Sequence, residues 1–232
     1  MSVLTIEELH KMADVHTCMN GAMDAYNSIS SSAQCLRLSG RYDGQVTIRK
    51  TAEGRAHVAF RGSESTKDWL INLSRNQVDY PPIAGAGVHA GFLRQHDGLW
   101  EQIVSHLQTY ETLESHGILV TGHSLGGGLA TLFYVRIASL LPSVSVACYV
   151  FGAPRVGNQV FVGGAKRLDN LSMLRVNNAY DLIPQIPIRG YVHTSNVVTL
   201  PTDQNLWWFQ GLARHSMKRM CQQFQRQRTS FI

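Results

Sequence analysis

One serine of this chain lies in a pattern that suits nucleophilic catalysis. The segment Gly122-His123-Ser124-Leu125-Gly126 follows a β-type run, 118–120, and precedes a helical run, 129–135. A G-x-S-x-G pattern between strand and helix is typical of a nucleophile elbow, a tight turn that exposes the serine hydroxyl. Glycine is expected at 122 and 126 because a Cβ would clash across the turn. The N–H of Leu125 would then lie at a helix N-terminus and stabilise an oxyanion.

Such a serine needs a histidine base, and the histidine needs a carboxylate that holds its tautomer and stabilises the imidazolium. In folds that use this turn, the acid and then the base follow the serine in the chain. Asp181 comes just after the carboxyl end of a predicted strand, whereas Asp169 precedes that strand and is expected in a solvated turn. We favour Asp181 as the acid. As the base we favour His215, on a loop before a terminal helix, with His193 in the β-like run 191–194 as the alternative.

A second oxyanion donor is expected from the loop after an earlier strand. Gly62 permits close approach of the backbone, and Ser63 offers both its N–H and its hydroxyl. His123, inside the elbow, is expected to point back and support neighbouring turns. No cluster of His, Cys, Asp or Glu has metal-ligand spacing, so we expect no metal and no cofactor.

The predicted elements place these groups at one edge of a sheet. Strands are predicted at 45–49, 56–60, 118–120, 144–151 and 171–176, and helices at 96–113 and from the elbow to about Leu141. A capping box, Thr5 with Glu8, opens an amphipathic helix near the start. Alternating strands and helices imply an α/β fold whose mostly parallel sheet is flanked by helices. Active groups collect at the carboxyl ends of such strands.

Composition favours one globular domain over residues 1–232, with 44% hydrophobic and 16% charged residues. No apolar run approaches the ~20 residues of a membrane span, so we expect no transmembrane segment. The start lacks a basic region followed by an apolar one, which favours an intracellular location over a processed secreted form. Cys148 is expected in the core, and free thiols are expected throughout, with two disulfides as the alternative in a secreted protein. In that case Asn72 and Asn170 would be glycosylation sequons.

The net charge of +5 is concentrated at the C-terminus. Without the five basic residues of the tail, 16 basic residues remain against 16 acidic ones. We favour a solvated helix face for this tail, with attachment to an anionic lipid surface as the alternative. No aromatic platform or motif supports nucleic-acid binding. The five tail residues, all after the last acidic residue, are Arg214, Lys218, Arg219, Arg226 and Arg228.

Together these pieces resemble the class 3 (fungal-type) lipase family of α/β-hydrolases, from about Val58 to His215. The order of the motifs is more specific than any one of them. They are Phe60-Arg61-Gly62-Ser63, Asp68-Trp69-Leu70-x-Asn72-Leu73, Val88-His89-x-Gly91-Phe92-Leu93, Gly122-His123-Ser124-Leu125-Gly126-Gly127, Phe151-Gly152-Ala153-Pro154-Arg155-Val156-Gly157-Asn158, and Asp181 with a later histidine.

The resemblance implies an α/β-hydrolase fold in which Ser63 and Leu125 supply the oxyanion donors and Asp181 and His215 match the acid and the base. Leu182 replaces the proline that usually follows the acid. A short lid helix is implied after the oxyanion loop, at 64–73, and is expected to open at a lipid surface. Its apolar surface would come from Trp69, Leu70, Ile71 and Leu73. The cluster 207–209 would line an acyl pocket, touch lipid or pack in the core.

The function implied is a serine hydrolase that cleaves lipid esters through an acyl-enzyme, with triacylglycerol as the favoured substrate and transient contact with a lipid surface. Phospholipase activity and a carboxylesterase or feruloyl esterase acting on soluble substrates are the alternatives within the enzyme class. A non-catalytic lipase-like interaction module is the alternative outside it.

Overall fold

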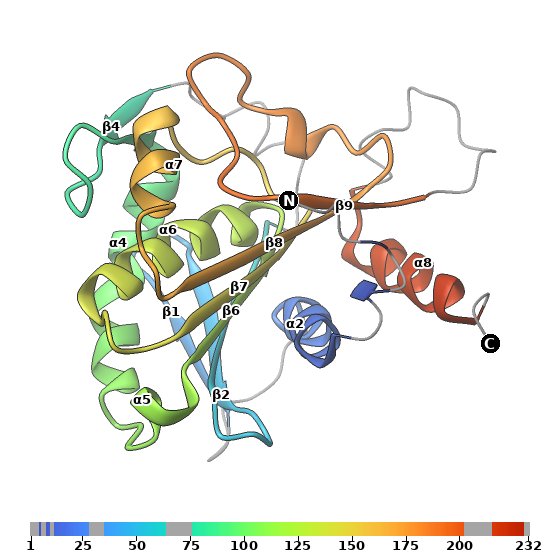
Figure 1. Cartoon of the computed structure of the whole chain (residues 1–232), viewed down its shortest axis with the longest axis horizontal. Helices are drawn as coiled ribbons and strands as arrows, with labels where there is room; N and C mark the ends of the chain where they lie inside the picture. Colours follow the sequence, from blue (N-terminus) through green and yellow to red (C-terminus); the bar gives the residue numbers. More distant parts are fainter. Residues whose placement is uncertain are drawn as a thin grey trace.

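The computed structural model describes residues 5, 8–9, 12–27, 35–63, 76–201 and 215–229. A seven-stranded sheet forms its centre (Figure 1), with strand order β1-β2-β3-β6-β7-β8-β9. Strands β1 to β3 pair antiparallel, and the strands from β3 to β9 pair parallel. The bounds are β1 Cys35–Ser39, β2 Gln45–Lys50, β3 Ala56–Phe60, β6 Ile118–His123, β7 Val146–Phe151, β8 Leu171–Asn178 and β9 Val197–Leu200.

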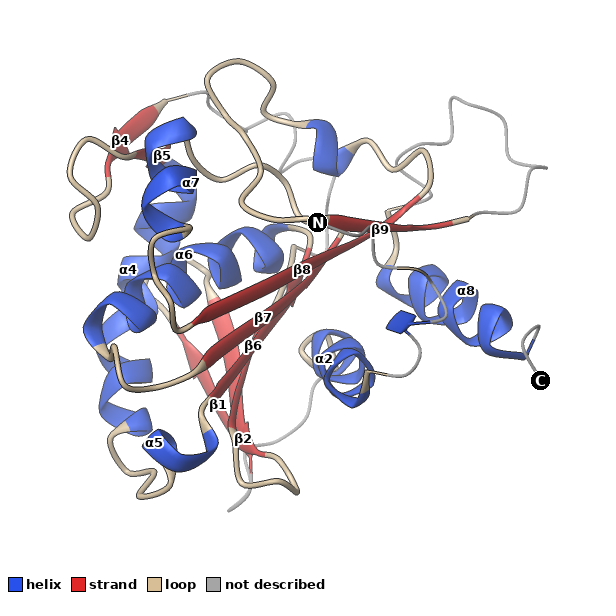
Figure 2. Ribbon diagram, in the orientation of Figure 1, coloured by secondary structure: helices blue, strands red, loops and turns tan. Residues whose placement is uncertain are grey.

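Helices cover both faces of this sheet (Figure 2). Helices α4 and α6 pack on one face, and α2 and α8 pack on the other. A mostly parallel sheet between helices is the α/β-hydrolase architecture that the sequence predicted. The helices are α2 Ala13–Asp24, α4 Ala90–Leu107, α5 Leu113–His116, α6 Leu125–Leu140, α7 Gln159–Ala165, the 3-10 turn η1 Ile183–Gln185 and α8 Met217–Thr229, and a separate pair, β4 Gln77–Asp79 and β5 Gly87–His89, lies outside the sheet.

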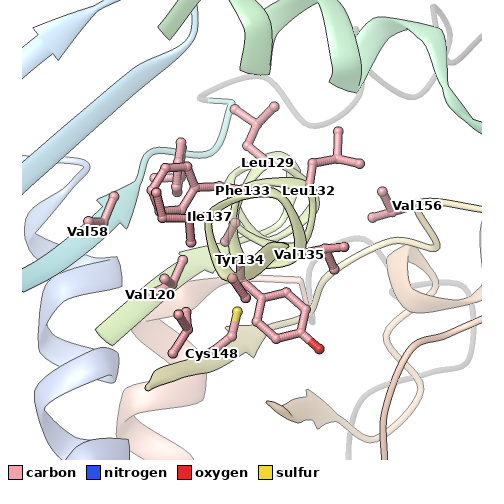
Figure 3. Packing of buried hydrophobic residues seen from close by; sticks show 14 of the residues in the cluster. Val58, Val120, Leu129, Leu132, Phe133, Tyr134, Val135, Ile137, Cys148 and Val156 are labelled. Carbon is pink, nitrogen blue, oxygen red and sulfur yellow. The ribbon is translucent and has the colours of Figure 1, made fainter. Parts of the chain in front are cut away.

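Helix α6 lies at the centre of the larger core (Figure 3). Its side chains from Leu125 to Val135 are all buried, because the sheet covers one side and α4 covers another. Val58, Val120 and Cys148 come from three adjacent strands and face the helix. A helix that is apolar all round requires burial on all sides. The elbow is thereby anchored on the most buried helix of the fold.

The N-terminus of α4 differs from the prediction. It begins at Ala90 rather than at residue 96, because the His89 ring caps it by accepting from the N–H groups of Gly91 and Phe92 at 3.2 and 3.3 Å. Histidine is not among the usual capping residues, and Gly91 weakens the helical signal of this turn.

Other boundaries differ as well. Helix α4 ends at Leu107 rather than at 113, and the chain turns before α5. Strand β1, at the edge of the sheet, was not predicted. Its residues are only half-buried and include the charged Arg37, so the strand lacks a strong apolar signal. Strand β7 begins two residues later than expected and β8 extends two residues further. The run 191–194 forms no strand, only a bridge from Val192 to Gly157.

Several local predictions are confirmed. Thr5 and Glu8 make the capping box: the Thr5 N–H donates to the Glu8 carboxylate at 2.7 Å, and the Glu8 N–H donates to the Thr5 hydroxyl at 3.2 Å. All four cysteines are free thiols, and Cys148 is fully buried. The side-chain amide of Asn170, the asparagine of one possible sequon, donates to the carbonyls of Ala138, Leu141 and Val144.

The basic residues of α8 that the structure describes lie on the solvated side of that helix. Met217, Met220 and Phe224 are buried against the second core, whereas Lys218, Arg219 and Arg226 are exposed. Among the described residues, no helix is both long enough and apolar enough to span a bilayer.

Candidate active site

Ser124 occupies a strained turn between β6 and α6. Its backbone has φ 58° and ψ −128°, a region that L-residues rarely adopt. The Ser124 N–H donates to the carbonyl of Phe151 at 3.0 Å, and its carbonyl accepts from the N–H of Gly127 at 2.9 Å. Strain of this kind persists only where the surroundings over-determine the turn. The turn is therefore built to hold one side chain in a fixed place.

The two elbow glycines are required for different contacts. A Cβ at Gly122 would lie 2.2 Å from the carbonyl oxygen of Gly126, across the turn, as the sequence predicted. A Cβ at Gly126 would lie instead 2.3 Å from the carbonyl oxygen of Phe60, at the end of β3. The second glycine thus allows the elbow to approach the neighbouring loop that carries Ser63.

Asp181 and His215 meet in a buried pair. Asp181 follows β8 and His215 precedes α8, and Nδ1 of His215 donates to Oδ2 of Asp181 at 2.7 Å. The other carboxylate oxygen accepts from the N–H of Ile183 at 3.0 Å. Both side chains are fully buried. Because Nδ1 carries the shared proton, Nε2 is left with a lone pair, the form that a general base needs.

Glycine is also required beside this pair, at a position without a sequence prediction. Gly152 has φ +53°, and a Cβ there would lie 3.0 Å from Oδ2 of Asp181 and 3.0 Å from Cε1 of His215. The bare backbone after β7 leaves room for the imidazole and the carboxylate.

Within the described residues, the Oγ of Ser124 and the Nε2 of His215 have no hydrogen-bond partner, and both atoms are buried. The serine–histidine bond is thus not made in this state. Bonds of this type are often long in unliganded sites and tighten when substrate binds.

The loop that carries Ser63 lies against the elbow. A Cβ at Gly62 would lie 2.6 Å from the carbonyl oxygen of His123, so only glycine fits this approach. Ser63 is half-buried beside it. Leu125 is the first residue of α6, and the first N–H groups of a helix have no acceptor within that helix. Both expected oxyanion donors therefore belong to segments that meet at the elbow.

The ring of His123 stacks on the ring of the predicted base His215, a contact the sequence did not predict, with centroids 4.6 Å apart and planes inclined by 23°. Its Nδ1 lies 2.8 Å from the hydroxyl of Tyr26, which follows α2. Burial, and then the nearby His215, hold the pKa of His123 well below its ordinary value. Tyr26 had no sequence signal, because it lies 97 residues before its partner.

The alternative residues lie elsewhere. Asp169 is exposed in the turn before β8. His193 has Nε2 2.7 Å from the carbonyl oxygen of Pro184, and burial, with Arg175 and Arg155 nearby, lowers its pKa to about 4. This histidine anchors the loop after Asp181 and does not contact the carboxylate.

Some predictions fall outside the described residues. These are the lid segment 64–73 with Trp69, Leu70, Ile71 and Leu73, the sequon residue Asn72, the tail residue Arg214 and the cluster 207–209. Over the part of the chain that the structure does describe, no three metal-binding side chains gather. The residues brought together are a strained serine and a histidine whose Nδ1 is bonded to a buried carboxylate, which is the set of groups that acyl transfer uses.

Known proteins are similar to this chain in sequence. The family model of lipase (class 3) matches residues 57–191. The lipase of Rhizomucor miehei is 32% identical over 160 residues, which are 66% of this chain and 44% of that protein. Phospholipase A1-II 7 of Oryza sativa subsp. indica is 29% identical over 183 residues, 64% of this chain and 45% of that protein. The chain thus spans less than half the length of these relatives.

The fold matches solved lipase structures as well. A triacylglycerol lipase whose catalytic centre is described as a serine protease triad superposes with a TM-score of 0.76 at 25% identity, covering 87% of this chain and 83% of that one. A Rhizomucor miehei triacylglyceride lipase superposes with a TM-score of 0.75 at 24% identity, covering 86% and 82%. With a family model matched over more than half of its residues, this chain belongs to the class 3 lipase family of the α/β-hydrolase superfamily.

Proposed function

We propose that this protein is a serine hydrolase that cleaves carboxylic esters of lipids, with triacylglycerol as the favoured substrate. The observation that carries the proposal is the buried hydrogen bond between Asp181 and His215 in the same site as the strained Ser124. A binding protein has no need for a buried carboxylate that fixes an imidazole tautomer beside an elbow serine.

In the proposed reaction, the Oγ of Ser124 attacks the ester carbonyl carbon while Nε2 of His215 takes the hydroxyl proton. Asp181 stabilises the imidazolium, and the N–H groups of Leu125 and Ser63 stabilise the oxyanion. Collapse of the tetrahedral intermediate expels the alcohol, which takes the proton from His215. Water then attacks the acyl-enzyme by the same route and releases the fatty acid. Each oxyanion donor is worth ~3 kcal/mol of transition-state stabilisation.

A lipid substrate is supported by the surface next to Asp181. Three apolar side chains between β8 and β9 are exposed: Tyr180 at 73%, Leu182 at 52% and Ile188 at 70%. Asp181 is the one acidic residue of the segment 178–190, and it is buried, whereas Arg189 is exposed. An apolar and cationic segment beside the acid suits transient contact with an anionic lipid surface.

Phospholipid is the second candidate substrate. Relatives named phospholipase A1 match about two thirds of the chain, at an identity close to that of the relatives named lipase. The same acyl transfer serves both classes, so the head group is decided by the surroundings of the site and not by the triad.

The test compares three substrates with the full chain and with Ser124→Ala. They are tributyrin across its solubility limit, phosphatidylcholine vesicles, and a soluble p-nitrophenyl ester. A rate that rises at the emulsion and vanishes in the variant supports a lipase. Faster hydrolysis of vesicles favours phospholipid, and saturation below the solubility limit indicates an esterase for soluble substrates. Equal rates in the two proteins, or no hydrolysis of any ester, would overturn the proposal and favour a non-catalytic module.

A further inference from the structure

We propose that Tyr26 and His123 are positioning residues for His215, and that they tie the base and the oxyanion loop to one support. This inference rests on the proposed function, because it gives His215 the role of base. Neither residue touches the reacting atoms in the proposed mechanism, and both act through the residues they contact.

The contacts leave His215 little freedom. Its Nδ1 edge is held by Asp181 at 2.7 Å, and the ring of His123 is stacked on it with centroids 4.6 Å apart. Gly152 lies so close that a Cβ there would be 3.0 Å from the imidazole. The carboxylate alone permits rotation of the ring about the hydrogen bond, whereas a stacked ring opposes that rotation. His123 therefore fixes the plane of the imidazole that aims Nε2.

The stacked ring is itself fixed by Tyr26. The Tyr26 hydroxyl lies 2.8 Å from Nδ1 of His123, and the two rings meet edge to face with centroids 5.8 Å apart. Burial raises the pKa of the phenol, so it keeps its proton and can donate. A donor on Nδ1 leaves the imidazole of His123 neutral. Neutrality matters because a second positive charge stacked on His215 would oppose the imidazolium that forms during catalysis.

The same hydroxyl reaches the oxyanion loop. A Cβ at Gly62 would lie nearer to the Tyr26 hydroxyl than to any other atom, at 2.1 Å. Tyr26 thus packs against the residue before Ser63 while it bonds to the residue before Ser124. One side chain beyond the end of α2 supports the nucleophile, the base and the oxyanion loop.

Helix α2 is fastened to the strand that leads into the elbow. The Oγ1 of Thr121, in β6, lies 3.2 Å from the carbonyl oxygen of Cys18, in α2, and 2.8 Å from that of Tyr149, in β7, so the hydroxyl lies between the helix and the sheet. Cys18, Met19 and Ala22 of α2 are buried in the second core together with Leu119 of β6. The support for Tyr26 is therefore a packed helix and not a mobile loop.

The test is a double-mutant cycle with Tyr26→Phe and His123→Phe, measured as kcat and KM on a soluble p-nitrophenyl ester. The matched control is Tyr80→Phe, which also removes a buried tyrosine hydroxyl, here bonded to the carbonyl of Leu132 in α6 at 2.8 Å, in the core away from the site. We expect Tyr26→Phe to lower kcat about tenfold with KM unchanged, and Tyr80→Phe to leave kcat unchanged. Tyr26→Phe should cost less when added to His123→Phe than when added to the wild type, because the part of its effect that passes through His123 is already lost.

The pH profile separates positioning from general loss of structure. A phenyl face stabilises an adjacent imidazolium better than an imidazole face does, so the acid limb of kcat/KM should move to higher pH in His123→Phe. A purely structural role would lower the plateau and leave the limb in place.

Three outcomes would overturn the inference: equal kcat in Tyr26→Phe and Tyr80→Phe, multiplicative losses in the double variant, or an unmoved acid limb. If His123→Phe does not fold, the comparison of Tyr26→Phe with Tyr80→Phe decides alone. Failure of the proposed function looks different, because the wild-type protein would then be inactive and its Ser124 would not react with a fluorophosphonate.

Discussion

Gly126→Ala tests whether contact between the elbow and the loop after β3 sets the oxyanion geometry. The new Cβ would lie 2.3 Å from the carbonyl oxygen of Phe60, and real Cβ contacts are essentially never under 3.0 Å. The elbow and the loop carrying Ser63 must therefore separate by about 0.7 Å. Overpacking costs about 1–3 kcal/mol of stability, partly offset by the ~1 kcal/mol that alanine gains over glycine in a helix. A misplacement of about 0.7 Å at the oxyanion donors should lower kcat by ten- to a hundredfold.

The assay measures kcat on a soluble p-nitrophenyl ester together with the thermal midpoint of unfolding. The matched control is Gly163→Ala in α7, where no atom lies within 4 Å of the added Cβ. We expect Gly126→Ala to stay folded with a reduced kcat, and Gly163→Ala to keep its kcat. An unchanged kcat in Gly126→Ala would show that the close approach of the elbow to the loop after β3 does not set the oxyanion geometry.

Three further predictions concern the acid, a buried histidine and the exposed apolar surface. Asp181→Asn should fold normally and lose about 10⁴-fold in kcat, because the amide favours the wrong imidazole tautomer; a loss below tenfold in steady-state kinetics would argue against the pair. Burial lowers the pKa of His57 from 6.5 to about 3. The unfolded chain therefore binds a proton first as the pH falls, and stability drops by about 1.4 kcal/mol per pH unit between those values. In urea unfolding, His57→Gln should lose less stability than wild type between pH 7 and pH 4, and an equal loss would count against this assignment. Ile188→Ser should weaken binding to anionic vesicles about five- to tenfold in a flotation assay. Leu140→Ser, exposed at the far end of α6, should not, and equal losses would remove the case for a lipid-contacting surface beside Asp181.

Local signals predicted the elbow well. The elbow pattern consists of the glycines at 122 and 126 and the apolar runs beside them, which are all close in sequence. The structure has the predicted strand β6, the turn at Ser124 and the helix α6 in that order. The alternation of predicted strands and helices along the chain predicted the mostly parallel sheet, because parallel neighbours need crossover connections. The pairing of Asp181 with His215 followed from placing the acid after a strand end and the base on a loop that can reach over the strand ends, and the structure brings them within 2.7 Å.

Contacts between distant segments escaped prediction. The orientation of His123 depends on Tyr26, which lies 97 residues away and is an ordinary tyrosine at the end of a helix. The sequence predicted Gly152 only as the residue that ends a strand, whereas the structure shows that it leaves room for the imidazole of His215. The start of α4 depends on a histidine cap, which is a rare choice of residue. Each of these contacts depends on the three-dimensional arrangement or on an unusual residue choice, and sequence patterns do not show either.

The central claim is that Ser124 is a nucleophile activated by His215. The most direct measurement is intact-mass analysis after reaction with a fluorophosphonate, for wild type, Ser124→Ala and His215→Ala. We expect one adduct per wild-type chain, located on Ser124 by peptide mapping, no adduct in Ser124→Ala, and labelling slowed by orders of magnitude in His215→Ala. A wild-type chain that takes up no label, or a His215→Ala chain labelled at the wild-type rate, would contradict the central claim.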